Sequence, residues 1–155
     1  MTEVTVVPAQ QAHVDYLRGR IRQADVDEVW RSGHQVAGDC VQRGLKQSSK
    51  CWVTLAGGEP CMIFGVAPVS VLSRTGTPWM LATDRIEDIK PSVARRSRHY
   101  VGSMMEGFDL LRNWVDFENT RSILWLKRLG FTVEDPAPYG PEGHLFRYFW
   151  RKKDV

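Results

Sequence analysis

The stretch Asn119–Phe131, NTRSILWLKRLGF, has the pattern of a short amphipathic helix with a sharp beginning and a sharp end. Asn119 is a suitable N-cap, because its side-chain oxygen can accept a backbone N–H of the first helical turn. Three aliphatic residues share one face of this helix: Ile123, Leu126 and Leu129. Gly130 can adopt the left-handed conformation that ends many helices. We therefore expect a capped helix that packs one apolar face against a sheet.

Apolar segments flank this helix and predict a sheet around it. LLRNWVDF (110–117) and FTVED (131–135) each predict a strand. Further upstream, the apolar residues of 91–108 keep a helical period, and PWMLATD (78–84) predicts another strand. The strand–helix–strand unit from Trp79 to Val115 should cross right-handedly and make its two strands parallel neighbours.

The first half of the chain combines helical and strand patterns. Apolar spacings from Gln10 to Val29 predict one helix with a break near Ala24, and those from Val36 to Leu45 predict a second helix. The segment 50–69, KCWVTLAGGEPCMIFGVAPV, contains two apolar runs around two glycines, which is typical of a β-hairpin. With VTVVP as a first strand and HLFRYFW as a last one, the expected order is β-α-α-β-β-β-α-β-α-β-β. This order indicates the α/β (α+β) class, with a central mixed sheet.

Length, charge and cysteine count narrow the class of protein. The 155 residues, 1–155, fit a single domain, and the net charge of +3 is too small to indicate a nucleic-acid-binding protein. No apolar run approaches the roughly 20 residues that cross a bilayer, and no signal-peptide pattern opens the chain. The three cysteines form no CxxC pair, and their odd number argues against a disulfide framework. Free thiols in a reducing, cytoplasmic compartment are the expected state.

The helix and its flanking elements together resemble the GNAT superfamily of N-acetyltransferases. The coenzyme-binding motif of that family runs Asn, two residues, Ala or Ser, an aliphatic residue and, at the end, Leu-Gly-Phe. The matching residues here are Asn119, Ser122, Ile123, Leu129, Gly130 and Phe131. The resemblance implies a three-layer fold, with helices on both faces of a mixed sheet of about six to seven strands. It also implies acetyl-CoA as the cofactor of any enzymatic activity.

The resemblance also implies where a coenzyme would bind. Backbone contacts are expected from Leu81, Ala82 and Thr83, phosphate contacts from Ser92, Arg95 and Arg96, and contacts on the adenine-nucleotide side from Asn119 and Ser122. Two departures weigh against an active enzyme. The segment 83–96 contains no glycine, although the family places there a Gly-rich loop whose backbone N–H groups hold the diphosphate. The position of the Tyr general acid of many members holds Leu126.

A narrower resemblance concerns a family of tailed-phage proteins with a GNAT-like fold, which includes the T7-type internal virion protein required for particle assembly. The stretches that carry it, in this order, are PWMLATD, RRSRHYVGSMM, LLRNWVD and NTRSILWLKRLGF. It implies a phage or prophage protein that acts in virion assembly through contacts with other virion or assembly proteins, with a degenerate acyl-CoA site. Its expected location is the bacterial host cytoplasm, with association with the virion as an option. The alternative is an acetyl-CoA-dependent N-acetyltransferase with an atypical coenzyme loop.

No catalytic residue and no metal site can be named from the sequence. The four histidines are far apart and form no motif with a carboxylate or a cysteine: His13, His34, His99 and His144. Contact with nucleic acid through Arg95, Arg96, Arg98 and the C-terminal RKK is a third, disfavoured alternative, because acidic residues lie between these charges. Three tryptophans either pack in the core or line the cleft where two strands separate: Trp79, Trp114 and Trp125.

Overall fold

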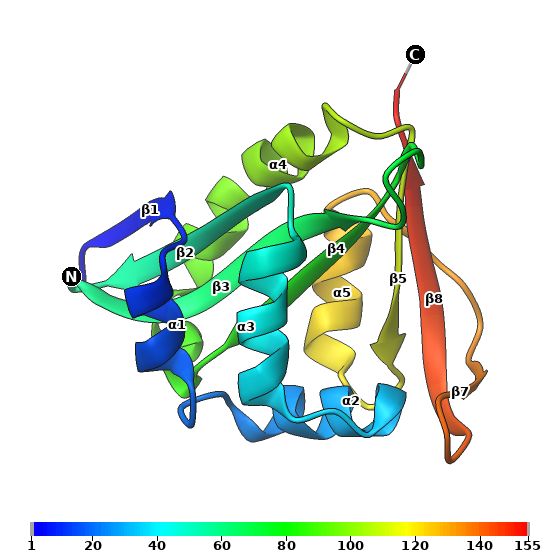
Figure 1. Ribbon diagram of the computed structural model, residues 1–155, viewed down its shortest axis with the longest axis horizontal. Helices are drawn as coiled ribbons and strands as arrows, with labels where there is room; N and C mark the ends of the chain where they lie inside the picture. The colour runs from blue at the N-terminus through cyan, green and yellow to red at the C-terminus, as the bar shows by residue number, and fades with distance from the viewer. Residues whose placement is uncertain (1, 155) are drawn as a thin grey trace.

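The computed structural model describes residues 2–154, which form three layers: a mixed eight-stranded sheet with helices on both faces (Figure 1). The elements in chain order are β1 (Val4–Pro8), α1 (Gln11–Leu17), α2 (Gln23–Gly33), α3 (Ala37–Gln47), β2 (Lys50–Ala56), β3 (Glu59–Pro68), β4 (Thr75–Ala82), the 3-10 helix η1 (Asp84–Ile89), α4 (Lys90–Met105), β5 (Leu110–Asp116), α5 (Thr120–Arg128), β6 (Thr132–Val133), β7 (Ala137–Tyr139) and β8 (His144–Lys152). The strand order is β1-β2-β3-β4-β5-β8-β6, and β7 pairs with β8 beside this path.

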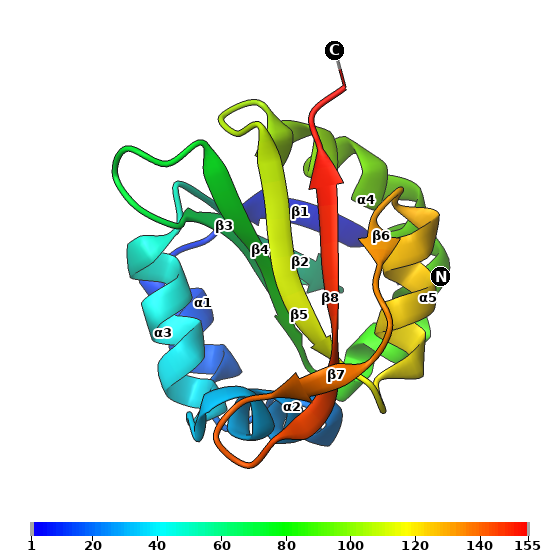
Figure 2. The same ribbon diagram turned by 90° about the vertical axis from the view of Figure 1, so that its right-hand side faces the viewer.

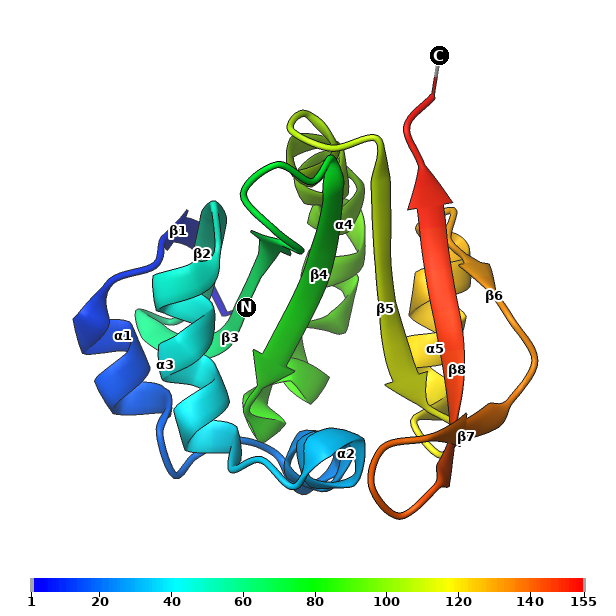
Figure 3. The ribbon, with the colours of Figure 1, turned by 45° about the vertical axis from the view of Figure 1, so that its right-hand side comes forward.

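The helices divide between the two faces of the sheet. Figures 2 and 3 show α1 and α3 on one face and α4 and α5 on the other, while α2 lies across the end of the sheet at which β4 and β5 end. On the first face, Val14 and Leu17 of α1 and Val41 of α3 pack against Val53 and Ile63, all fully buried. A larger apolar cluster fills the space under α4 and α5. Burial of these apolar faces is the main stabilising contribution to the layered arrangement.

The sheet separates at its only parallel pair among the described strands. β4 and β5 pair at Thr75–Leu110 and Gly76–Leu111 and then diverge, whereas β3 stays paired with β4 along its length and β8 with β5. The two central strands therefore form a V that opens towards α2, as Figure 3 shows.

Most of the expected elements are present, and the parallel β4–β5 pair is confirmed. The expected break in the first helix is misplaced: the chain leaves helix after Leu17 and re-enters it at Gln23, because Gly19 at φ +76° turns the backbone there and not near Ala24. The sheet has one strand more than expected, since the three-residue β7 gives no period in the sequence.

Two further features bear on the expectations. All three cysteines are free thiols, and Cys61 is buried. None of the helices within residues 2–154 combines the length and the apolar character that crossing a membrane requires.

Candidate functional site

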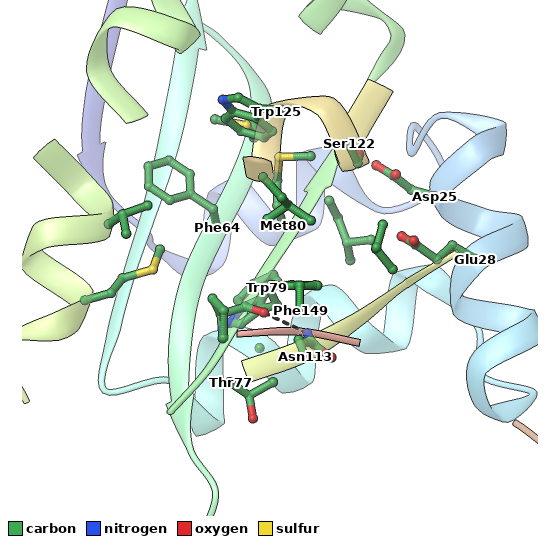
Figure 4. A pocket seen from close by; sticks show the side chains of 18 of the residues that line it. Asp25, Glu28, Phe64, Thr77, Trp79, Met80, Asn113, Ser122, Trp125 and Phe149 are labelled. Atoms are coloured by element: carbon green, nitrogen blue, oxygen red, sulfur yellow. Dashed lines mark hydrogen bonds between the residues drawn. The ribbon is translucent and has the colours of Figure 1, made fainter. Parts of the chain in front are cut away.

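A cavity of about 430 Å³ occupies the V between β4 and β5 and reaches both faces of the sheet. On one face it is bordered by α2 and α3, and we call this opening the α2/α3 mouth; residues lining it include Asp25, Glu28, Ser32, Arg43 and Gln47. On the other face it is bordered by α4 and α5, and we call this opening the α4/α5 mouth; residues lining it include Val93, Arg96, Ser97, Ser122 and Trp125. Figure 4 shows side chains from both sides pointing into this space. A small molecule entering from one face can therefore meet one entering from the other.

The V begins where β4 loses a backbone donor. Pro78 has no N–H and cannot continue a ladder towards β5. Its carbonyl instead accepts a hydrogen bond from the Asn113 side chain of β5, with 2.7 Å between Nδ2 and O (Figure 4). This side-chain bridge closes the vertex of the cavity and satisfies a carbonyl that the separating strands would leave unpaired.

Beyond the vertex, the edge of β4 that faces β5 offers a single free pair of backbone groups. The Ala82 N–H donates to Asp25 Oδ2 at 2.9 Å, and the Ala82 carbonyl accepts from the Arg22 N–H at 2.8 Å. Backbone groups alternate in direction along a strand, so the groups of Met80 face the same edge as those of Ala82 and Pro78. The Met80 N–H and C=O therefore point into the cavity, where an extended amide could pair with them.

Glu28 is the ionisable group with the most unusual environment in the cavity. Its Oε1 accepts a hydrogen bond from the Asp116 backbone N–H at 2.7 Å. Burial raises the pKa of Glu28 from 4.5 to about 7; the Asp116 hydrogen bond opposes this shift, and the negative charges of Asp25 and Asp116 add to it. The Asn119 amide also favours the charged form, although its Nδ2 makes no hydrogen bond of good geometry within residues 2–154.

Glu28 is surrounded by protein and still reachable from the cavity. The side chain keeps some exposed surface because one side of it lines the open α2/α3 mouth, while α2, β5 and the segment that follows β5 enclose the rest. A carboxylate whose pKa is about 7 and that lies at such a mouth can take a proton from an incoming group at pH 7.

The donor to Glu28 is itself held in place. The Asp116 carboxylate accepts from the Arg31 guanidinium at 3.0 Å and from the Glu118 N–H at 2.9 Å. Arg31 belongs to the same helix as Glu28, so these contacts tie α2 to the end of β5. The orientation of the Glu28 carboxylate is therefore set by two elements that are far apart in sequence.

The predicted coenzyme residues are distributed unevenly around the cavity. Leu81 lines it, Thr83 caps η1 by accepting from the Arg85 N–H, and Ala82 uses its backbone groups on Asp25 and Arg22. Met80, one residue before the predicted stretch, presents the free edge instead.

The remaining predicted residues lie at or near the α4/α5 mouth. Arg96 and Ser122 line the cavity, but Arg96 donates to the Val4 carbonyl at 2.6 Å. Ser92 and Arg95 bond to each other on the exposed surface. Asn119 caps α5 through Oδ1, which accepts from the Ser122 N–H at 3.4 Å.

The segment ahead of α4 does not form a phosphate-binding loop. It is the 3-10 helix η1, in which the Arg85 and Ile86 N–H groups bond to Thr83. Pro91, in the first turn of α4, has no N–H to offer. The backbone here cannot cradle a diphosphate in the way that a glycine loop does.

Sequence reasoning missed Glu28, Tyr100 and Tyr139, which all line the cavity. A signal for Glu28 was present: Asp25 and Glu28 follow each other at helical spacing on the face of α2 that meets the sheet. Trp79, Trp114 and Trp125 line the cavity, in agreement with the cleft interpretation. Within residues 2–154, no cluster of three or more His, Cys, Asp or Glu side chains could hold a metal ion.

Comparison with known proteins identifies the fold. Neither the protein-family models nor the curated proteins that were searched gave a match to this sequence. Among solved structures, Ard1 from Thermoplasma volcanium has a TM-score of 0.73 at 16% identity, with 98% of this chain and 99% of that chain covered. An acetyltransferase of the GNAT family from Streptococcus pneumoniae has a TM-score of 0.67 at 13% identity, over 97% and 100% of the two chains.

A third similar structure contains a coenzyme. AAC(6′)-Ib in complex with ribostamycin and coenzyme A has a TM-score of 0.69 at 15% identity, with 97% of this chain and 94% of that chain covered. The similarity extends over nearly the whole chain in all three cases, while the sequence identity is low. The chain therefore has the fold of the GNAT acetyltransferases.

Proposed function

We propose that this protein transfers an acyl group from an acyl-CoA thioester to an amine. The observation that carries the proposal is the cavity through the sheet, with the Glu28 carboxylate at one mouth and the free backbone edge of Met80 inside. An acyl donor and an acceptor can meet there from opposite faces. The GNAT fold of the solved structures, one of which contains coenzyme A, supports this reading.

The residues present fit the pantetheine part of the coenzyme better than its diphosphate. Met80 offers one N–H and one C=O to a pantetheine amide, and Phe64 and Trp125 give the channel apolar walls. The diphosphate finds no backbone cradle in η1, so it would have to rely on side chains at the α4/α5 mouth. When bound, acyl-CoA would supply the acyl group as an activated thioester.

Glu28 is the general base in this proposal. An amine substrate carries a proton at neutral pH, and its nitrogen must lose protons to form an amide. With a pKa of about 7, the Glu28 carboxylate is half ionised at neutral pH and accepts a proton from the amine efficiently. Asp25, only 1% exposed, is already paired with the Arg22 guanidinium at 2.8 Å, so the proposal assigns the proton-accepting role at this mouth to Glu28 alone.

The test combines binding and turnover. Calorimetric titration should detect acetyl-CoA binding to both the wild type and Glu28→Gln, because the amide side chain of the variant keeps an oxygen for the Asp116 N–H. With a panel of polyamines and aminoglycosides, Glu28→Gln should release thiol at least about 100-fold more slowly than the wild type. The wild-type rate should rise with pH through about 7, and the variant should lose this rise.

The control is Glu106→Gln, whose carboxylate is 72% exposed and lies outside the cavity lining, so it should be dispensable. Undetectable binding at millimolar acetyl-CoA, or equal rates for Glu28→Gln and the wild type, would rule out the proposal.

A second candidate function is virion assembly in a bacterial host cytoplasm, as the phage-family resemblance implies. The observation that favours it is the loop between β3 and β4, where Val71 and Leu72 are 99% and 94% exposed. Such apolar side chains are suited to contacts with another protein. A Val71→Ser, Leu72→Ser variant in the encoding phage genome should lower particle yield and leave acetyl-CoA binding unchanged. Normal infectious yield after deletion of the gene would reject this candidate.

A further inference from the structure

Three charged side chains join η1 to the beginnings of α4 and α5 beside the α4/α5 mouth. One carboxylate oxygen of Glu87, in η1, accepts from the Lys90 ammonium, and the other accepts from the Arg121 guanidinium of α5. The hydrogen bond from Lys90 holds the pKa of Glu87 below its usual value, with Arg121 contributing in the same direction. The carboxylate is therefore ionised at neutral pH and bridges two helices.

This bridge lies at the edge of the cavity. Arg121 immediately precedes Ser122, and Lys90 lies one turn before Val93; Ser122 and Val93 both line the cavity. Figure 2 shows α4 and α5 on the same face of the sheet. Both helices begin at the end where the V is open, so a ligand that enters between their N-terminal ends passes the bridge.

The electrostatics at this point favour an anion. Two cationic side chains meet at the N-terminal ends of two helices, and each helix adds partial positive charge there. The anion that occupies the position is the protein's own Glu87 carboxylate. Its side chain is 39% exposed, and those of Lys90 and Arg121 are 47% and 67% exposed. Ion pairs with this exposure are weak, so a ligand anion of higher charge can displace the carboxylate.

We propose that Glu87 is an internal competitor for the phosphate of a phosphorylated pantetheine ligand, and that Lys90 and Arg121 bind this phosphate once Glu87 has moved aside. The proposal rests on the proposed function, since it assumes that a pantetheine thioester enters this mouth. It replaces the missing backbone cradle with two side chains whose charge is masked when no ligand is bound. Coenzyme A and 4′-phosphopantetheine share the required chemistry, and they differ in the number of phosphate groups.

The proposal predicts that removing the charge of Glu87 and removing the charge of Arg121 have opposite effects on the affinity for coenzyme A. Glu87→Gln removes the competing charge and should tighten binding of coenzyme A about three- to tenfold at low salt. Arg121→Gln removes a phosphate contact and should weaken binding by a similar factor. A purely structural ion pair would behave differently, because losing either partner would then loosen the same contact and weaken binding in both variants.

The experiment measures by calorimetry the affinity of each variant for coenzyme A, 4′-phosphopantetheine and pantetheine. Each titration is done at roughly 20 mM and at roughly 300 mM NaCl, because the Debye length differs several-fold between these two salt concentrations. The Glu87→Gln gain should appear with the two phosphorylated ligands, be larger for coenzyme A, shrink at high salt and be absent with pantetheine. The matched control is Glu106→Gln, which breaks the exposed pair with Lys50 at the other end of α4 and should change no affinity. Thermal melting of each variant checks that it is folded.

The outcomes separate this proposal from the proposed function. Equal affinities of Glu87→Gln and the wild type for coenzyme A would overturn the Glu87 proposal, and wild-type binding would leave the proposed function standing. A gain with pantetheine as large as that with coenzyme A would also overturn it, since the effect would not concern phosphate. If none of the three ligands binds to the wild type or to Glu87→Gln, both proposals fail.

Discussion

The two mouths of the cavity hold their charged groups in different environments. At the α2/α3 mouth, Asp25 and Glu28 are enclosed by protein, and burial is the main reason for the raised pKa of Glu28. At the α4/α5 mouth, Glu87, Lys90 and Arg121 are exposed, and their charges are paired with each other. The difference lies in desolvation, which changes proton affinity strongly at the first mouth and hardly at the second.

This difference suggests a division of labour. An enclosed carboxylate is costly to ionise and is therefore suited to proton transfer. Exposed ion pairs are weak and exchange readily, so they are suited to binding a charged ligand reversibly. Changes at the first mouth should accordingly affect chemistry and pH dependence, whereas changes at the second should affect ligand affinity.

The largest expected stability effect concerns Glu28 and its pH dependence. Since its pKa is raised to about 7 in the folded protein, the neutral form stabilises the fold below the ordinary value of 4.5, and this contribution is lost as the pH rises through 7. Glu28→Gln removes the cost of ionisation and should raise the free energy of unfolding at pH 8 by about 2–3 kcal/mol relative to the wild type. Urea denaturation at pH 5 and pH 8 measures this.

The gain from Glu28→Gln should be much smaller at pH 5, because the wild-type side chain is then mostly neutral. Glu106→Gln, a change at an exposed carboxylate outside the cavity, should show no such pH-dependent gain. A constant difference between Glu28→Gln and the wild type across this pH range would mean that the Glu28 carboxylate is as well solvated as those at the other mouth.

A smaller effect should distinguish the helices that border the two mouths. A Cβ added at Gly44 of α3 would lie 2.3 Å from Cζ2 of Trp79, whose Nε1 is fixed by a 2.7 Å hydrogen bond to Ser48 Oγ. Gly44→Ala should therefore cost about 1–2 kcal/mol in the free energy of unfolding, even after the gain in helix propensity. Chemical denaturation measures the change.

The matched substitution on the other face is Gly102→Ala in α4, where a Cβ meets nothing within 4 Å. It should stabilise the protein by about 0.5–1 kcal/mol, because alanine favours helix over glycine. If both substitutions have the same sign, Trp79 is free to move, and the α2/α3 mouth is less tightly packed than described above.

A modest effect is also expected between the mouths, at the vertex. Asn113→Ala removes the hydrogen bond to the Pro78 carbonyl and should reduce the free energy of unfolding by about 1 kcal/mol. Asn113→Asp should have a similar effect, because an ionised carboxylate has no donor for that carbonyl. If Asn113→Ala proves as stable as the wild type in urea denaturation, the vertex is held only by the pairing of Thr75 and Gly76 with β5.

Local signals in the sequence predicted much of this fold. The helix after Asn119 is capped as expected, and Gly130 after it adopts φ +87°. The hairpin at Gly57 and Gly58, both with positive φ, was predictable for the same reason. In each case the residues that determine the conformation are neighbours in the chain.

The candidate site was harder to predict because it depends on contacts between distant residues. The raised pKa of Glu28 comes mainly from burial, and part of what encloses its side chain is the end of β5, where Asp116 lies 88 positions away in the sequence. Which residue of β4 offers a free backbone edge depends on the β3–β4 register and on the side chain of Asp25, so the stretch from Leu81 to Thr83 could not be refined to Met80 from the sequence. The 3-10 helix before α4 also depends on a cap, at Thr83, that no period reveals.

The proline at the vertex has a consequence for how this cavity could evolve. A residue without an amide hydrogen cannot donate to the neighbouring strand, so it limits how far the two strands can pair, whether or not a ligand is present. Replacing Pro78 with a residue that has this hydrogen would let pairing advance along β5 and would shorten the hollow from its closed end. The depth of the cavity thus depends in part on one covalent ring, and a single substitution at Pro78 could change it between related proteins.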